Sequence, residues 1–273
     1  MENRKITFIG AGNMAHAIIA GLVKNGYPAE RITVCSPNTT RRDVLAEKYG
    51  INSQSDNIRC AQEADVVVLA VKPQIMADVC RDLNLQVNFS QKLLLSIAAG
   101  MPVSRFYAFL SDNLNIIRIM PNTPASIGQG MSGMFAPEQV NHSDRQFAES
   151  LMKSVGKVCW VENENNINDI IAIAGSAPAY FFLFMESMHQ EAERLGFDSQ
   201  TARELILQTA IGSTKLAESQ AELPFSILRE QVTSKGGTTA EALRIFYENH
   251  LPEVVSQAMQ GAIHRAQEME KLF

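Results

Sequence analysis

The sequence predicts an α/β fold in which an N-terminal domain with a mostly parallel sheet is followed by an all-helical domain. Short runs rich in Val, Ile and Leu alternate with helical patterns through the first part of the chain, which is typical of β–α–β units. Two of these runs, VVVLAV and LLLSIAA, are apolar without interruption, as expected of strands covered on both faces. From about Asn165 onward only long helical patterns follow, so we predict two domains, residues 1–163 and residues 164–273.

Each expected element can be placed by its residues. The strands are KITFIG, RITVCS, DVVVLAV, KLLLSIAAG and NIIRIMP, with GMSGMFAP and GKVCWVE at the far side of the sheet. The helices between them are NMAHAIIAGLVKNG, a polar helix near RRDVLAEKYG, QIMADVCRDL and VSRFYAFL. The second domain contains the helical patterns NDIIAIAGSAPAYFFLFMESMHQEAERLG, QTARELILQTAIGSTKLAESQ, EALRIFYENH and PEVVSQAMQGAIHRAQEMEKLF.

Composition narrows the class of protein. The chain of 273 residues is 46% hydrophobic, which is typical of a soluble globular protein with buried cores. Its formal net charge is −5 and no basic stripe is present, so we do not expect a nucleic-acid partner. Cys35, Cys60, Cys80 and Cys159 lie far apart without a Cys-x-x-Cys pair. This spacing suits neither a metal site nor a disulfide framework, and it favours reduced thiols in the cytoplasm.

The most apolar segment, residues 170–185, predicts self-association. It is shorter than the roughly 20 residues that a membrane span needs, and Pro178 interrupts it, so we expect a buried core helix and no membrane partner. Apolar side chains crowd almost every face of this helix, and such a helix must be enclosed. Enclosure by a second copy in an isologous dimer is our prediction. Enclosure by the two domains of one chain is the alternative.

The segment GAGNMA, residues 10–15, follows the first expected strand and opens a helix. Gly10 permits a tight turn, Gly12 lets a pyrophosphate approach the backbone, and Ala15 allows the helix to pack closely on the strand. A glycine pattern alone is a weak signal. In this position, at the start of a β–α–β unit, it predicts a Rossmann-type dinucleotide-binding domain.

The end of the second strand indicates which dinucleotide binds. An acidic residue there would accept hydrogen bonds from the ribose 2′-hydroxyl of NAD, but the chain has Ser36-Pro37-Asn38 instead, with Arg41 and Arg42 just beyond. A hydroxyl, an amide and guanidinium groups can hold a 2′-phosphate. We therefore predict NADPH, with NADH as an alternative donor. The opposing interpretation is that both arginines are solvated helix residues.

Two further strand ends carry candidate residues, because open α/β sheets bind ligands at the carboxyl ends of their strands. The first is the turn Ala70-Val71-Lys72-Pro73, where a lysine faces the expected crevice. The second is Ala98-Ala99-Gly100, whose small residues leave room for a flat ring. Lys72 is our candidate for a catalytic role at the nicotinamide side. A plain surface charge is the alternative.

The stretch TSKGGTTAEAL, residues 233–243, predicts a helix that begins just after a glycine pair. Unpaired backbone N–H groups at such a helix start favour a bound anion. A plain helix cap is the other interpretation.

The order of GAGNMA, AVKP, SIAAG, RIMPNTP, GSAPAY and SKGGTTAEAL resembles the pyrroline-5-carboxylate reductase family over nearly the whole chain. SKGGTTAEAL is the most specific of these, since it is similar to the family's signature. The resemblance implies an NADP-binding Rossmann domain and a helical domain that interlocks into a dimer, with dimers often assembled into larger rings such as decamers. It implies NADPH-dependent reduction of 1-pyrroline-5-carboxylate to L-proline, the last step of proline biosynthesis.

The resemblance also implies roles for individual residues. Thr239 would hydrogen-bond the substrate's ring nitrogen, and the backbone around Gly237 and Thr238 would hold its carboxylate. Glu164 matches a position near the substrate. Together with the residues above, the predicted cofactor site contains Gly10, Gly12, Asn13, Met14, Ser36, Asn38, Arg41, Asn57, Ala70, Val71, Lys72, Pro73, Ala98, Ala99 and Gly100. The predicted substrate site contains Glu164, Ser234, Gly236, Gly237, Thr238 and Thr239.

The chain departs from the family pattern at two positions. Ala177 stands where the family commonly has glycine, which adds a methyl group to a packed helix. Lys235 stands where the family commonly has proline, which places a cation beside the expected carboxylate site.

Two other functions are weighed against the reductase. A β-hydroxyacid dehydrogenase would carry a lysine after a glycine pair on a long helix, and GSAPAYFFLFM has none. A non-catalytic NADP-binding sensor would keep the fold and the dimer, but the intact SKGGTT loop argues against it.

Overall fold

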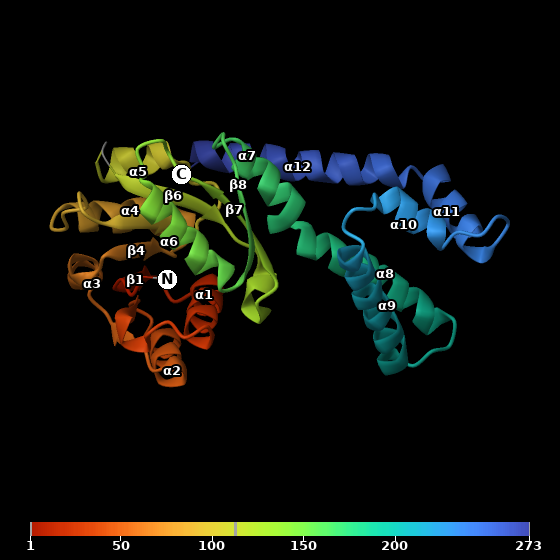
Figure 1. Cartoon of the computed structure of the whole chain (residues 1–273), viewed down its shortest axis with the longest axis horizontal. Helices are drawn as coiled ribbons and strands as arrows, with labels where there is room; N and C mark the ends of the chain where they lie inside the picture. Colours follow the sequence, from red (N-terminus) through yellow and green to blue (C-terminus); the bar gives the residue numbers. More distant parts are fainter. Residues whose placement is uncertain (1, 112–113, 273) are drawn as a thin grey trace. The chain divides into compact units, whose positions relative to one another are not determined.

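The structure is a computed structural model that describes residues 2–111 and 114–272 (Figure 1). By their contacts these residues form two compact units. The sheet unit contains the residues up to Pro178 and those from Gly261 onward, and the helical unit contains Ala179–Gln260. Residues 164–178 and the end of the chain thus group with the sheet. The boundary expected after residue 163, between a cofactor-binding domain and a substrate-binding domain, remains a prediction.

Eight strands in the described part of the chain form one mostly parallel sheet, as predicted. Its order is β3-β2-β1-β4-β5-β6-β7-β8, and only the β6–β7 pair is antiparallel. The strands are β1 (Ile6–Ile9), β2 (Ile32–Cys35), β3 (Asn52–Gln54), β4 (Val66–Leu69), β5 (Leu93–Ser96), β6 (Asn115–Met120), β7 (Gly130–Phe135) and β8 (Gly156–Trp160). Every residue of β1, β4 and β5 is buried, which explains their uninterrupted apolar runs.

Helices cover both faces of this sheet. They are α1 (Asn13–Lys24), α2 (Thr39–Tyr49), α3 (Asn57–Glu63), α4 (Pro73–Asn84), α5 (Val103–Phe109) and α6 (His142–Lys153). Two clusters of buried apolar side chains result. One includes Phe8, Ile18 and Phe147, and the other includes Met76 and Phe106. The buried clusters therefore fix the sheet, and the sheet in turn positions the loops at the ends of its strands.

Trp160, the last residue of β8, lies against α6. Its indole Nε1 donates a hydrogen bond of 3.1 Å to Glu149 Oε2, and the guanidinium of Arg145 lies 5.9 Å from the ring centroid. Tryptophan commonly pairs its polar N–H while its ring packs against neighbours. The far edge of the sheet is thus fastened to α6.

The remaining elements follow β8. They are α7 (Asn166–Ile170), a π-helix (Ile171–Gly175), α8 (Ala177–Arg194), α9 (Ser199–Ser219), α10 (Phe225–Gln231), α11 (Thr238–Glu248) and α12 (Leu251–Leu272). Asn122 meets the irregular turn, because its Nδ2 donates 3.1 Å to the Ala174 carbonyl and its Oδ1 accepts from Met131 N at 2.9 Å. The single long helix expected here is therefore interrupted by a π-helix, an irregularity often found at functional sites.

Within one chain the helix expected to be buried at residues 170–185 is largely exposed, and its enclosure by a second copy stays a prediction. Helix α8 has no buried residue, and Phe181, Phe182 and Leu183 are each more than 60% exposed. The span Asn166–Arg194 is long and apolar enough to cross a membrane by length and composition, and only 11% of its most apolar window is buried. The apolar pattern was recognised correctly, but no part of the described chain covers it.

Candidate functional site

The carboxyl ends of four neighbouring strands are aligned by the sheet register. Ile9 pairs with Cys35 of β2 and with Leu69 of β4, and Leu69 pairs in turn with Ser96 of β5. The residues that directly follow these strand ends are Gly10, Ser36, Ala70 and Ile97. Four of the sequence-predicted segments therefore lie along one edge of the sheet. After β1 the chain continues to β2 on one side, and after β4 it continues to β5 on the other side. Ligands bind at such a switch point in folds of this kind.

Gly10 and Gly12 shape the first loop of this edge in different ways. Gly10 has φ +115°, and a Cβ there would lie 2.5 Å from the Ala70 carbonyl oxygen, so only glycine fits. Gly12 is the N-cap of α1, without a side-chain cap, and a Cβ at this residue would meet no heavy atom within 4 Å. The start of α1 thus leaves open space beside unpaired backbone N–H groups, which suits a pyrophosphate.

The residues after β2 form a compact polar turn. Ser36 is 8% exposed, and its Oγ accepts a hydrogen bond of 3.2 Å from Asn38 N. Asn38 caps α2 through its Oδ1, which accepts from Arg41 N at 3.1 Å, so its side-chain oxygen is already engaged. The Arg41 side chain is exposed. Ser36 and Arg41 fit the predicted 2′-phosphate contact, whereas Asn38 has only its Nδ2 to offer.

Arg42 takes a role that leaves it less available to a ligand. Its Nη1 donates 3.2 Å to the Ser36 carbonyl, and its Nε lies 2.8 Å from Asp43 Oδ1. The Asp43 carboxylate raises the pKa of Arg42 above its usual value. This guanidinium therefore stabilises the turn after β2 through the Ser36 backbone.

Asn57, the first residue of α3, offers an unused polar atom. Its Oδ1 is buried and has no hydrogen-bond partner in the described structure. The preceding residue, Asp56, already caps the helix by accepting from Ile58 N and Arg59 N at 3.0 and 3.1 Å. A buried acceptor without a partner is costly, so Asn57 fits a hydroxyl donor of a bound cofactor.

The turns after β4 and β5 complete the edge. Lys72 is the N-cap residue of α4, with an exposed side chain, and Pro73 opens the helix. After β5, Ala98 is 6% exposed and Gly100 has φ +69°. The second turn is thus built from small residues, as predicted, and its Gly100 packs closely against Met269.

Glu164 lies in the sheet unit, where protein groups already bind its carboxylate. Its Oε1 accepts a hydrogen bond of 2.7 Å from Val103 N and one of 3.1 Å from Nη1 of Arg118. Arg118 is 1% exposed and also pairs with Glu270 of α12. Sequence reasoning missed Arg118 and Glu270. An arginine within the apolar run NIIRIMP was the available signal.

The loop at residues 233–239 lies in the helical unit and leads into α11. Gly236 has φ +71°, and Gly237 is the N-cap of α11 without a side-chain cap bond. The chain turns tightly here, since Gly237 N donates 3.0 Å to the Ser234 carbonyl. Thr238 and Thr239 are therefore the first two helical residues, and neither is the capping residue. Backbone N–H groups at this helix start remain free for an anion.

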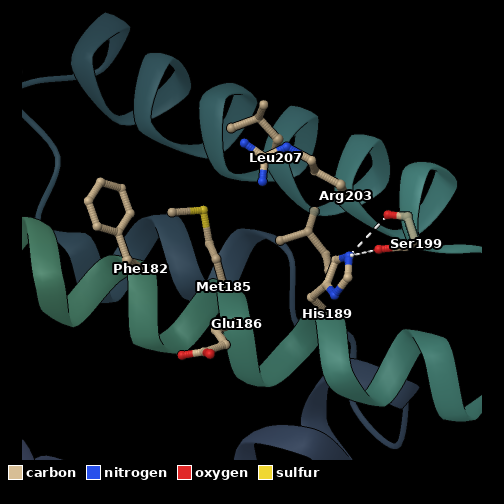
Figure 2. Close-up of a pocket in the computed structure, with 8 residues that line it drawn as sticks. Phe182, Met185, Glu186, His189, Ser199, Arg203 and Leu207 are labelled. Atoms are coloured by element: carbon tan, nitrogen blue, oxygen red, sulfur yellow. Dashed lines mark hydrogen bonds between the residues drawn. The ribbon is translucent and has the colours of Figure 1, made fainter.

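A separate hollow of about 460 Å³ opens on the helical unit between α8 and α9 (Figure 2). Its lining is mixed, with Phe182, Met185 and Leu207 beside Glu186 and Arg203. His189 Nε2 bonds the backbone and side-chain oxygens of Ser199 at 3.0 and 3.3 Å. None of the predicted site residues lines this hollow, which belongs to the exposed apolar surface of α8.

Comparison with known proteins assigns families to both parts of the chain. Residues 5–100 match the family model described as NADP oxidoreductase coenzyme F420-dependent. Residues 164–269 match the model described as pyrroline-5-carboxylate reductase dimerisation, so the helical part is a self-association domain. The second match begins close to the end of β8, where the strands stop.

Full-length relatives extend this result. The pyrroline-5-carboxylate reductase of Vibrio alginolyticus is 58% identical over 273 residues and covers 100% of both chains. Among solved structures, a pyrroline-5-carboxylate reductase from Coxiella burnetii has a TM-score of 0.92 at 40% identity, covering 98% of this chain and 99% of that one. The Plasmodium falciparum pyrroline carboxylate reductase with NADP bound has a TM-score of 0.88 at 28% identity, covering 99% of each. By fold, sequence and length, the chain belongs to the pyrroline-5-carboxylate reductase family.

Proposed function

We propose that this protein reduces 1-pyrroline-5-carboxylate to L-proline with NADPH as the hydride donor. The observation that carries the proposal is the aligned edge of strand ends, with its open glycine loop and the unpartnered Asn57 oxygen, in a chain of this family. The NADP-bound relative supports the choice of cofactor. We assign cofactor binding to residues 1–163, and substrate binding and dimerisation to residues 164–273.

The cofactor is held by the sheet edge in this proposal. Gly10, Gly12, Asn13 and Met14 receive the pyrophosphate at the start of α1, where the helix dipole favours negative charge. Ser36, Asn38 and Arg41 hold the 2′-phosphate, and Asn57 accepts a hydrogen bond from a ribose hydroxyl. Bound NADPH supplies a hydride to the imine carbon. The turns at residues 70–73 and 98–100 flank the nicotinamide.

The substrate is held by its carboxylate and its ring nitrogen. Ser234 and the backbone of Gly236, Gly237 and Thr238 bind the carboxylate at the N-terminus of α11, and the Lys235 ammonium adds a nearby positive charge. Thr239 Oγ1 donates a hydrogen bond to the ring nitrogen as it becomes an amine. An ordinary hydroxyl is a weak acid, so Thr239 positions the ring and solvent delivers the proton. Glu164 and Lys72 contribute charge near the reacting ring.

The assembly and location are part of the same proposal. A second copy covers the apolar faces of α8 and the hollow beside it, which accounts for a membrane-like helix without a membrane. Dimers assemble further into a ring, as the family resemblance implies. The enzyme acts in the cytoplasm without membrane or nucleic-acid partners.

One assay tests the activity directly. At fixed enzyme concentration, NADPH oxidation is followed with 1-pyrroline-5-carboxylate and with a six-membered cyclic imine, and NADP⁺ reduction is followed with a 3-hydroxyacid. We expect turnover with the five-membered imine and none with the hydroxyacid. Turnover with the hydroxyacid alone indicates a β-hydroxyacid dehydrogenase, and tight NADPH binding without any turnover indicates a sensor.

Ser36 is expected to decide between the two cofactors. Ser36→Asp places a carboxylate beside the 2′-phosphate, and like charges repel, so NADH should replace NADPH as the donor with the higher kcat/KM. Steady-state rates with both donors measure the change, and Ser36→Ala is the matched control that adds no charge. A retained NADPH preference in Ser36→Asp contradicts this location of the 2′-phosphate.

A further inference from the structure

An ion cluster around the buried Arg118, with two partly exposed carboxylates, joins the last turn of α12 to β6. Arg118 is 1% exposed, and its Nη1 lies 3.1 Å from Glu164 Oε1 while its Nη2 lies 2.9 Å from Glu270 Oε1. In the sheet register Arg118 pairs with Ser96, the last residue of β5. The cluster is therefore one strand away from the start of the turn at residues 98–100.

A second contact fastens the same helix end. Arg105 of α5 donates from its Nη2 to the backbone carbonyls of Glu270 and Lys271 at 3.2 and 3.4 Å, and Figure 1 shows this end of α12 beside α5. Carbonyls in a last helical turn lack intrahelical partners and carry partial negative charge. A guanidinium there satisfies them, so two arginines from two elements hold one helix turn.

This helix turn contacts the turn after β5 directly. A Cβ built on Gly100 would lie 2.8 Å from Cβ of Met269, so the backbone of the turn has no spare room. Gly100 also has φ +69°, a conformation that favours glycine. If Met269 moved away from Gly100, the turn at residues 98–100 would lose the side chain against which it packs.

We infer that Glu270 is a positioning residue: with Arg118 and Arg105 it holds the last turn of α12 against Ala98-Ala99-Gly100 and so sets the shape of the nicotinamide side of the cofactor site. The inference rests on the proposed function because it takes this turn as part of that site. A buried ion pair adds little net stability over apolar packing. It does fix one arrangement of its elements, because displacement leaves a charge buried and unpaired.

The test compares Glu270→Gln, Arg105→Gln and the double variant with Glu268→Gln as the matched control. Glu268 lies on the same helix, is 43% exposed and pairs with Arg265 of its own helix. NADPH dissociation constants are measured by calorimetry, and amide hydrogen exchange is measured for the segment 97–103. We expect the NADPH dissociation constant to rise by about 2- to 30-fold in the single variants, the range for residues that act through others. The NADPH dissociation constant of the double variant should exceed those of both single variants.

Faster amide exchange at residues 97–103 with weaker NADPH binding supports the positioning role. A lowered melting temperature with an unchanged NADPH dissociation constant, or faster exchange confined to the end of α12, overturns it. If Glu270→Gln does not fold, Met269→Gly removes the Cβ atom that lies nearest to Gly100 and is measured in the same way. Neither readout needs an imine. An enzyme that fails to turn over 1-pyrroline-5-carboxylate therefore refutes the proposed function without deciding this inference.

Discussion

Replacing Phe182 by aspartate is expected to abolish the dimer and, with it, activity. Phe182 lies on α8 and is 61% exposed within one chain, on the surface that we assign to the second copy. In an isologous dimer both copies carry the change, so two carboxylates lose water at one interface. Leaving a charge buried and unpaired costs about 3–5 kcal/mol, which raises the dimer dissociation constant by at least about 100-fold.

Sedimentation or light scattering over a range of protein concentrations measures this effect, with NADPH oxidation followed in parallel. Leu85→Asp is the matched control, because Leu85 is an exposed apolar residue of the sheet unit, 81% exposed, and lies outside the matched dimerisation region. The control should remain dimeric and active. An active Phe182→Asp dimer contradicts the assignment of this surface.

Replacing Thr239 by alanine is expected to lower kcat/KM for the imine by about 10- to 1000-fold, the range for losing one positioned hydrogen bond in the transition state. Stability should hardly change, because Gly237 is the N-cap of α11 and no side-chain cap bond exists to be lost. A threonine acting as the cap would instead cost about 0.5–2 kcal/mol of folding free energy. The structure thus sharpens the contrast between the two interpretations of this loop.

Three measurements on the same variants check the role of Thr239: melting temperature, NADPH affinity and steady-state rates. Thr239→Ser keeps the hydroxyl and should recover most of the activity, which makes it the matched control. A destabilised Thr239→Ala protein with nearly normal turnover removes Thr239 from the active site.

The sequence predicted the sheet well because each buried strand is a short apolar run. Strand β3 was missed, since Asn52-Ser53-Gln54 has no apolar residue and only pairs at the sheet's edge. The π-helix was also missed, because a local change of hydrogen-bond pattern leaves the apolar composition unchanged. Local patterns therefore identify elements but not their irregularities.

The candidate site shows the same limit. Glycine spacing and strand ends identified Gly10, Gly12 and Ser36, whose roles depend on the chain immediately around them. The cluster of Arg118, Glu164 and Glu270 could not be predicted, because Glu270 lies far along the chain and reaches β6 only through tertiary packing. Which chain covers α8 could not be predicted for a related reason, since the apolar pattern is the same whether a second copy or the same chain covers this face.

The attachment of Trp160 to α6 has a consequence for following how this protein unfolds. Trp160 is the sole tryptophan, and Cys35, Cys60, Cys80 and Cys159 are the four cysteines, so none of these residues lies in the helical unit. Burial raises the pKa of Cys80 to about 12, so its thiol stays protonated and unreactive while the sheet is folded. Indole fluorescence and thiol labelling therefore report on the sheet unit alone, whereas loss of circular dichroism includes the melting of α8–α11. A difference between the two signals during denaturation reveals whether the two units unfold in one step or in two.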